Sequence, residues 1–476
     1  MIGRGERALL VLTPAVAMAA VGLGLRIGAP SDRRAAVVWG APVSRAGTGL
    51  AWQVQTFDEV RGTREAVAIA EVDVTARSGG HDVRWVGKTN DDGTAEMLLA
   101  APSPLGLHLD VRAGPTLLAS GDALPPPSFS QSPRPAAWAR FARRDGPVLL
   151  DVAFLGQRVA SGFPATIWVR ATDAASLVAL ASARIEADAQ PGLALEANDP
   201  ATDSRGWARL VATPTGYGVP LTLHARALDG RSGLWSGALF VSPGAAQIVT
   251  RDRYAVGEEP IFDVVVPSMR EFAYVEIDDR WGRVWGGALS LATPAREMPR
   301  GIARPPRLSP GLYWAVASGD PGGAAQLGPG TIVRPFFVAE SDEAAIASAP
   351  DDECSVPRDP REMSRALGVC LALAAVSPVP RWKVLDGFAA QRSSDERNRG
   401  AGLAVAVGAI LVAMVLEATL LGRVAQTARA RLRALAPDPS DGTEVGAKPR
   451  AGRFAIPLLV ALLGFALLVA FLLRLA

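Results

Sequence analysis

The chain has 476 residues and a formal net charge of +2, with 49 Lys and Arg residues against 47 Asp and Glu residues. A balance this close excludes the strongly basic surface that is typical of nucleic-acid-binding proteins, so no nucleic-acid partner is expected. The length exceeds what one hydrophobic core supports and predicts several domains.

The N-terminal segment is apolar. Residues 8–25 carry no charge and follow two arginines. This stretch is just long enough to cross a hydrocarbon core, which favours an uncleaved signal anchor over residues 1–26, the first predicted transmembrane helix. The alternative is a cleaved signal peptide, because Ala17-Met18-Ala19 fits a small-x-small cleavage site. In both cases the chain crosses the membrane here.

The pattern then becomes typical of β-structure. Apolar and polar residues alternate in stretches such as Val67 to Val74, and turns rich in Gly, Asn, Asp and Pro separate these stretches. Short strands with turns every eight to twelve residues are typical of a β-sandwich. We predict a first sandwich module over residues 37–124.

A second module repeats part of the first. The stretch Thr89-Asn90-Asp91-Asp92-Gly93-Thr94-Ala95 shares a Thr-x-x-x-Gly-x-Ala pattern with Thr202-Asp203-Ser204-Arg205-Gly206-Trp207-Ala208. Tight turns need Gly where φ is positive, and Ala then begins the returning strand. The repeat predicts a second module over residues 147–242, built like the first.

The repeat resembles the Thr-Asp-x-x-Gly-x-Ala hairpin in immunoglobulin-like modules of bacterial envelope proteins, of the macroglobulin-like and carboxypeptidase-regulatory-like kind. A third module, predicted over residues 243–340, is similar to macroglobulin-like domains. Residues 254–258 match their "Y-x-P-G-E" start, with Val256 in the proline position, and residues 308–313 match their "L-x-x-G-x-Y" strand. The resemblance implies tandem immunoglobulin-like β-sandwiches, and it implies no activity.

Two segments connect these modules to each other and to the C-terminal region. Residues 125–146 form a Pro-rich linker that we interpret as an extended spacer, with a partner-binding segment as the alternative. Residues 341–400 are predicted to form a juxtamembrane loop and a short helix. Asp359, Pro360 and Glu362 fit the start of that helix as a capping box.

The apolar run of that short helix, residues 367–376, is too short to span a membrane. A juxtamembrane helix and a helix packed against the modules both remain open, and a re-entrant segment is the third alternative.

Two further apolar stretches, residues 401–422 and 454–475, are predicted transmembrane helices. The loop between them, residues 423–453, is rich in Arg. Basic loops stay on the cytoplasmic side, so the three modules are expected on the periplasmic or extracellular side of a bacterial inner membrane. The predicted fold class is therefore mainly β, with tandem immunoglobulin-like sandwiches plus three transmembrane α-helices.

Both cysteines, Cys354 and Cys370, fall in the segment assigned to the exported side. An oxidising compartment favours a disulfide between them. The alternative is a buried thiol at Cys370, because that residue lies in an apolar run.

Glu417 is the ionisable residue within the predicted helix 401–422. Acids inside a membrane are costly and commonly mark a functional pairing. Glu417 is expected to reach the cytoplasmic interface, to pair with Arg423, or to pair with a partner subunit.

A possible interaction patch combines Asp278, Asp279, Trp281 and Trp285, because exposed aromatic residues beside charges mark interfaces. The alternative is that the tryptophans pack inside the sandwich. No catalytic residues, cofactor or metal site are predicted, since the three histidines are isolated and no nucleophile or phosphate-loop motif occurs. Residues 90–93 are interpreted as a plain turn rather than a Ca²⁺ loop.

These features predict a non-catalytic, membrane-anchored envelope protein that binds or scaffolds another envelope or membrane protein. The alternative is a subunit or sensor that couples exported ligand binding to a partner through the C-terminal helical hairpin.

Overall fold

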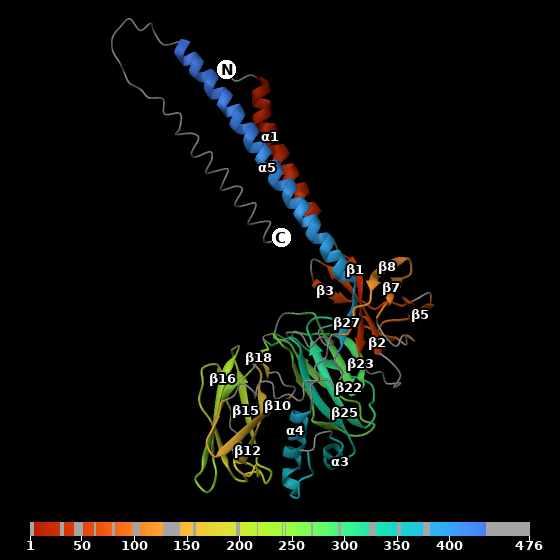
Figure 1. Cartoon of the computed structure of the whole chain (residues 1–476), viewed down its shortest axis with the longest axis vertical. Helices are drawn as coiled ribbons and strands as arrows, with labels where there is room; N and C mark the ends of the chain where they lie inside the picture. Colours follow the sequence, from red (N-terminus) through yellow and green to blue (C-terminus); the bar gives the residue numbers. More distant parts are fainter. Residues whose placement is uncertain are drawn as a thin grey trace, which may run out of the picture. The chain divides into compact units, whose positions relative to one another are not determined.

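The computed structural model describes residues 4–28, 33–41, 51–60, 63–78, 81–97, 99, 105–126, 143–155, 159–196, 200–216, 218–239, 241–242, 244–267, 270–293, 297–322, 330–349, 354–374 and 381–434. The chain is mainly β and divides into two compact units. One unit is Arg33–Phe388, and the other joins Met1–Asp32 to Ala389–Ala476. Figure 1 shows the sandwiches of the first unit and the long helices of the second.

The first sandwich, module 1, packs two sheets around one apolar core. One sheet has the order β27 (Trp382–Asp386), β1 (Arg33–Ala41), β2 (Ala51–Val60) and β3 (Thr63–Ala66), with β6 (Thr94–Met97) also paired to β2. The other sheet has the order β5 (His81–Gly87), β4 (Val72–Ser78), β7 (His108–Ala113) and β8 (Thr116–Asp122). Val38, Val54, Val74 and Leu109 belong to the core between the sheets.

Module 1 is discontinuous in sequence. Strand β27 lies in the segment predicted as a juxtamembrane loop, yet it pairs antiparallel with β1, as in Val38 opposite Leu385. Gly40 makes room for it, because a Cβ there would lie 2.8 Å from the ring of Trp382 and 2.9 Å from Val384. The chain therefore leaves module 1 after β8, forms the other two sandwiches, and returns to complete module 1.

The second sandwich, module 2, has one sheet ordered β10 (Val148–Phe154), β12 (Ala165–Asp173), β15 (Trp207–Pro214) and β14 (Leu193–Leu195). The facing sheet is ordered β13 (Arg184–Ala187), β16 (Val219–Arg226), β17 (Ser232–Leu239) and β9 (Arg143–Asp145). A short parallel pair joins β11 (Val159–Ala160) to β18 (Val241–Ser242). Strand β9 occupies the end of the predicted linker 125–146, whose residues 127–142 lie outside the described part of the chain.

The sequence repeat forms the same hairpin in modules 1 and 2. The Thr89 hydroxyl accepts from Ile69 N at 2.7 Å, and the Thr202 hydroxyl accepts from Ala183 N at 2.8 Å. Gly93 and Gly206 both have positive φ, 71° and 81°. Each glycine carbonyl accepts a hydrogen bond from a neighbouring strand, 2.9 Å from Thr56 N and 2.8 Å from Ala171 N. The threonine anchors the turn and the glycine permits the close approach, which explains why both recur.

The third sandwich, module 3, has one sheet ordered β19 (Gln247–Val249), β21 (Phe262–Val265) and β24 (Arg300–Ala303). The other is ordered β20 (Arg253–Tyr254), β26 (Ile332–Val338), β25 (Gly311–Ser318), β22 (Phe272–Asp279) and β23 (Gly282–Ser290). The strands β20 and β26 are parallel. The two macroglobulin-like motifs supply core tyrosines: the Tyr254 hydroxyl donates to Ile261 O at 2.5 Å and that of Tyr313 to Ser309 O at 2.8 Å.

A helical segment packs between modules 2 and 3. It contains α3 (Asp342–Ala347), the 3₁₀ turn η3 (Pro360–Glu362) and α4 (Met363–Leu373). Residues 366–372 of α4 are all buried. On one side Val369 contacts Trp168 and Trp207 of module 2, and on the other Leu367 contacts Phe337 of module 3. Of the three alternatives for this helix, the structure agrees with a helix packed against the modules.

The start of that helix differs from a capping box. The Asp359 carboxylate accepts from Arg361 N at 2.9 Å, as an N-cap does. Glu362, however, does not return to the cap. Its carboxylate accepts from Ser204 N and Ser204 Oγ of module 2, at 3.1 and 2.7 Å. Tertiary contact thus replaces the local partner that the sequence pattern predicts.

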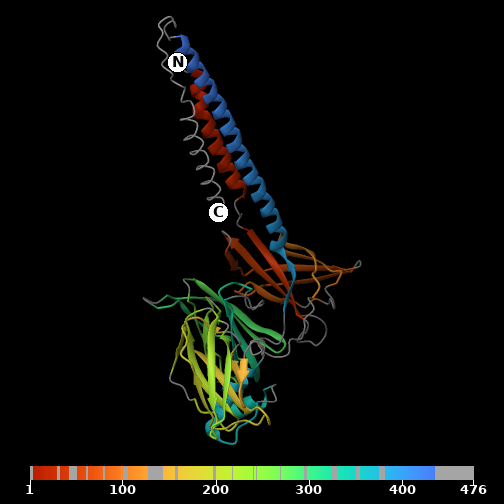
Figure 2. The same ribbon diagram turned by 60° about the vertical axis from the view of Figure 1, so that its left-hand side comes forward.

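The other unit contains α1 (Arg4–Gly28) and most of α5 (Gly387–Ala434), which lie side by side in Figures 1 and 2. Val21 packs against Ala406 and Ile410. A Cβ added to Gly24 would lie 2.5 Å from the Gly402 carbonyl oxygen, so small residues allow the two backbones to approach closely.

Among the described helices, one stretch is long and apolar enough to cross a membrane by length and composition, Glu396–Arg431 of α5. The apolar part of α1, Ala15–Gly24, is shorter. The predicted third transmembrane helix, 454–475, lies outside the described residues. The structure thus supports one of three predicted spans. It also extends α5 to Ala434, so the start of the predicted loop 423–453 is helical.

Candidate functional site

The four residues of the predicted interaction patch do not form one exposed surface. Asp278 is buried, with 2% of its surface exposed, and Trp285 packs against the core of module 3. Asp279 accepts a hydrogen bond from Trp281 N at 2.7 Å in the β22–β23 turn. Trp281 alone of the two tryptophans is exposed, at 41%. Asp278 is buried because its strand, β22, is covered on both faces, on one by the core of module 3 and on the other by module 1.

Asp278 belongs instead to a buried group of charges, which we call the ion cluster: Asp92, Glu276, Asp278, Arg283 and Arg381. Arg381, which directly precedes β27, holds two acids of β22. Its two terminal nitrogens lie 2.5 Å from Glu276 Oε1 and 2.5 Å from Asp278 Oδ1. One of them also donates to Gln53 Oε1 of β2 at 3.3 Å. The Arg381 side chain is 5% exposed, so these contacts are shielded from water.

Arg283 of β23 extends the ion cluster into module 1. Its Nη2 donates to the carboxylate of Asp92, which lies in the repeated hairpin turn, and its Nε lies 3.3 Å from Glu276 Oε1. The absence of a side chain at Gly286 makes this possible. A Cβ there would lie 2.2 Å from Arg283 Nη2 and 2.6 Å from Asp92 Oδ2. The turn that the sequence presents as a plain hairpin is thus also half of an inter-module ion pair.

Burial dominates the electrostatics of the ion cluster. Desolvation raises the pKa of Asp278 to about 7, although Arg381 opposes this effect, and the neighbouring Glu276 adds to it. Desolvation likewise raises the pKa of Asp92 against the pull of Arg283. For Arg381, burial opposes the charged form, but Asp278 and Glu276 outweigh it and raise the pKa. Burial thus raises the pKa of the two aspartates more than the arginines lower it.

Uncharged groups surround the ion cluster at the junction of modules 1 and 3. Tyr274 Oη of β22 accepts from Ala66 N of β3 at 3.2 Å across the junction, and within module 1 Gln55 accepts from Trp39 Nε1 at 3.3 Å. A cavity of about 20 Å³ lies among these groups and is lined by Asp92, Glu276 and Arg381. That volume is enough for one water molecule.

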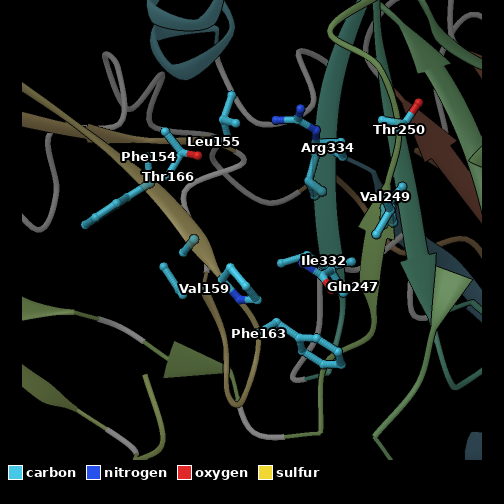
Figure 3. A pocket seen from close by; sticks show the side chains of 15 residues that line it. Phe154, Leu155, Val159, Phe163, Thr166, Gln247, Val249, Thr250, Ile332 and Arg334 are labelled. Atoms are coloured by element: carbon cyan, nitrogen blue, oxygen red, sulfur yellow. The ribbon is translucent and has the colours of Figure 1, made fainter. Parts of the chain in front are cut away.

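A larger cavity, of about 230 Å³, lies between modules 2 and 3. Figure 3 shows Phe154 and Val159 of module 2 on one side of it and Ile332 and Gln247 of module 3 on the other. Its walls are mainly apolar. Polar groups are few and include Arg334, which pairs with Asp252 at 2.5 Å, and Thr250, whose Oγ1 lies 2.8 Å from Tyr254 Oη. Apolar walls with few polar groups are typical of ligand-binding cavities.

Comparison with known proteins finds no family for the chain. No protein-family model and no curated protein matches the chain. The fold is immunoglobulin-like. Similar solved structures include invasin, a bacterial integrin-binding protein, at 12% identity over 64% of this chain, with a TM-score of 0.16. An I-band fragment of titin is 13% identical over 40% of this chain, with a TM-score of 0.15.

A third similar structure comprises three N-terminal domains of the highly immunogenic outer capsid protein of bacteriophage RB49. It is 10% identical over 65% of this chain and all of its own length (100%), with a TM-score of 0.15. The matches span 60% of the invasin chain and 65% of the titin chain, less than two thirds of each. At these values the likeness assigns neither a role nor a ligand to this chain.

The predicted disulfide is not formed. Cys354 and Cys370 are both thiols in the structure. Cys370 is buried in α4, and Cys354 is half-buried against the same apolar cluster, which also contains Leu367 and Ile346. The alternative of a buried thiol therefore describes Cys370.

Glu417 and Arg423 both lie on α5, and no ion pair joins them in the described part of the chain. Their separation of six positions turns them about 120° apart around a helix with 3.6 residues per turn, so they do not share a face. Pairing of Glu417 with a partner subunit remains a prediction.

The histidines have local roles. His108 Nδ1 lies 2.9 Å from Asp122 Oδ1, and His224 Nε2 lies 3.1 Å from Asp188 Oδ1, all within single sheets. Among the described residues, no group of three or more His, Cys, Asp and Glu is placed to hold a metal ion. The residues that sequence reasoning missed are Arg381, Arg283 and Asp92, whose partners are distant in sequence. One available signal was the presence of Glu276 and Asp278 in a strand whose neighbouring residues Ala273, Val275 and Ile277 are apolar.

Proposed function

We propose that this chain is a membrane-anchored protein of the bacterial envelope whose exported sandwich modules bind or scaffold another envelope or membrane protein. The observation that carries the proposal is the placement of three immunoglobulin-like modules between two helices. The strand that follows α1 and the strand that precedes α5 are neighbours in one sheet of module 1. Both connections to the helices thus leave from the same module, as suits an anchored domain array.

The cavity between modules 2 and 3 is the proposed recognition site. It combines apolar walls with the exposed Val249, half of whose surface (50%) is accessible to solvent. Buried apolar contacts supply most binding energy in protein interfaces, and a cavity lets a partner side chain desolvate fully. The proposed partner therefore inserts an apolar side chain between the two modules.

Reporter fusions to the full chain test the proposed topology. A phosphatase that is active only outside the cytoplasm, inserted after Pro126, is expected to be active. The same reporter fused after Ala434 is expected to be inactive, because the Arg-rich end of α5 is retained inside. The opposite pattern at the two positions would place the modules in the cytoplasm and reject the envelope function.

Val249→Glu is expected to abolish partner binding, lowering the recovery of the partner about 10-fold or more in affinity purification of the detergent-solubilised chain. The reason is that a charge placed in an apolar recognition cavity cannot be paired when the partner desolvates it. The measurement is quantitative mass spectrometry of proteins that co-purify with the wild-type chain.

Val86→Glu is the matched control. Val86 lies on β5 of module 1 and is 48% exposed, close to the 50% of Val249, but it is remote from the cavity lining. The control is expected to retain the partner. Equal retention of the partner by both variants would remove the cavity from the proposal and would point to another surface.

A second candidate function is a sensor or subunit that couples the modules to a membrane partner through α5. The observation that favours it is that α5 begins directly after β27, with Gly387 following Asp386. Phe388, the second residue of the helix, is fully buried against Trp39 and Phe57 of module 1. The helix start is therefore packed on the outer face of the β27–β1–β2 sheet of module 1, and movement of β27 reaches α5 without a flexible linker.

A further inference from the structure

The ion cluster is unbalanced. It contains three carboxylates, Asp92, Glu276 and Asp278, and two guanidinium groups, Arg283 and Arg381. With all five groups ionised, one buried negative charge is left without a counter-charge. A buried charge that is not compensated is costly, and uptake of one proton removes it.

We propose that the ion cluster is a proton-controlled latch between modules 1 and 3, which closes when the exported side of the membrane becomes mildly acidic and loosens when it becomes alkaline. The closed latch holds Arg381 and, through it, the strand β27 that continues into α5. The proposal deepens the second candidate function by naming its signal, the pH on the exported side. The consequence for α5 rests on that function.

Asp278 is the group that takes up the proton. Charged groups reach it from every element packed around it: Glu276 from its own strand, Arg283 from β23 and Arg381 from the segment before β27. On the other side it faces Trp314 of β25, which is uncharged. Module 1 adds Asp92 beside Arg283 and Glu96, whose charge acts on Arg381. The acids outnumber the bases in this set, so the balance favours protonation.

The sign of the pH dependence follows from linkage. The pKa of Asp278 is about 7 with the latch closed, against 3.8 for a solvated aspartate. Between these values the closed state binds one proton more than the open state, so opening becomes easier as pH rises through this window and levels off above it. The cavity of about 20 Å³ beside Glu276 and Arg381 gives a water molecule room to deliver the proton.

The position of Arg381 in the chain connects the latch to α5. Arg381 directly precedes Trp382, the first residue of β27, and α5 begins directly after Asp386 at the other end of that strand. Releasing the guanidinium from Glu276 and Asp278 removes the contacts that hold the start of β27 to module 3. Only the five residues of β27 thus separate Arg381 from the first residue of α5.

Hydrogen exchange of the full chain in detergent tests the latch without a partner. A negative result would therefore reject the latch and would leave the binding proposal untouched. Peptides covering residues 381–388 are expected to be on the order of 10-fold more protected at about pH 5.5 than at about pH 8, after correction for intrinsic exchange. A peptide covering β16 of module 2 is the internal reference and is expected to show equal protection at both pH values.

Asp278→Asn removes the excess charge permanently, so protection of residues 381–388 is expected to be high and independent of pH. Asp263→Asn, at an exposed pair with Arg300 in the same module, is the matched control and is expected to keep the wild-type pH difference. Equal protection of the wild type at both pH values overturns the proposal, as does an unchanged pH difference in Asp278→Asn. If Asp278→Asn does not fold, the wild-type comparison decides alone.

Discussion

Arg381→Met is expected to destabilise the unit Arg33–Phe388 by about 3–5 kcal/mol, the cost of removing one partner from a buried ion pair. Methionine keeps most of the side-chain length, but Glu276 and Asp278 then lose the guanidinium that lies 2.5 Å from each. The loss is expected to be larger at about pH 8 than at about pH 5.5, because Asp278 takes up a proton below its pKa of about 7 and its stranded charge disappears. Urea-induced unfolding followed by tryptophan fluorescence measures both quantities.

Arg300→Met is the control for that substitution. Arg300 pairs with Asp263 in the same module, but its side chain is 48% exposed, and exposed pairs contribute about 1 kcal/mol or less. A cost for Arg381→Met no greater than that for Arg300→Met would show that water reaches the ion cluster. In that case neither the junction nor the latch depends on Arg381.

Local sequence signals were sufficient for the sandwich fold because they describe interactions that are themselves local. Thr89 and Gly93 lie in one tight turn, and their copies Thr202 and Gly206 form the same hydrogen bonds. Strand alternation is equally local, as in β16, where alternate residues from Val219 to Ala225 are buried. Such signals recur with the module and predict immunoglobulin-like sandwiches.

The completion of module 1 could not be predicted in this way. The strand β27 has five residues, and it follows the helix α4 and precedes the long helix α5. Its partner β1 lies at the other end of the unit Arg33–Phe388, and no local pattern links Val38 to Leu385. The pairing becomes favourable only because Gly40 leaves space for Trp382 and Val384, a complementarity that appears in three dimensions.

The ion cluster was missed for a related reason. Asp92 and Arg283 are 191 residues apart, and Arg381 is 103 residues from Asp278. In sequence, Asp278 beside Trp281 predicts an exposed patch, because charged residues are seldom buried. The structure buries Asp278 because a second module supplies its counter-ion. Acidic residues among the apolar residues of a strand are the one local sign of such a partner.

Gly387→Ala is expected to destabilise the unit Arg33–Phe388 by about 1–3 kcal/mol, the usual cost of overpacking a close-packed site. A Cβ at this position would lie 2.5 Å from the Leu118 carbonyl oxygen, 2.7 Å from that of Ala36 and 2.9 Å from Ala119 Cβ. Two of these atoms belong to strand backbones, so relief requires either a shift of β8 and β1 or withdrawal of the start of α5. Hydrogen exchange in β1 and β8 is expected to accelerate, together with a lower urea midpoint.

Gly400→Ala in the same helix is the matched comparison. A Cβ there meets nothing within 4 Å, so the substitution is expected to leave stability unchanged or to raise it by about 0.5–1 kcal/mol through helix propensity. Opposite signs for one chemical change within one helix would show that α5 is clamped at its first residue and unconstrained farther along. That clamp is what coupling requires, because a helix whose start is packed against β1 and β8 of module 1 must follow β27 when the latch opens. If alanine is tolerated equally at Gly387 and Gly400, the helix start is loose and the sensor function loses its structural support.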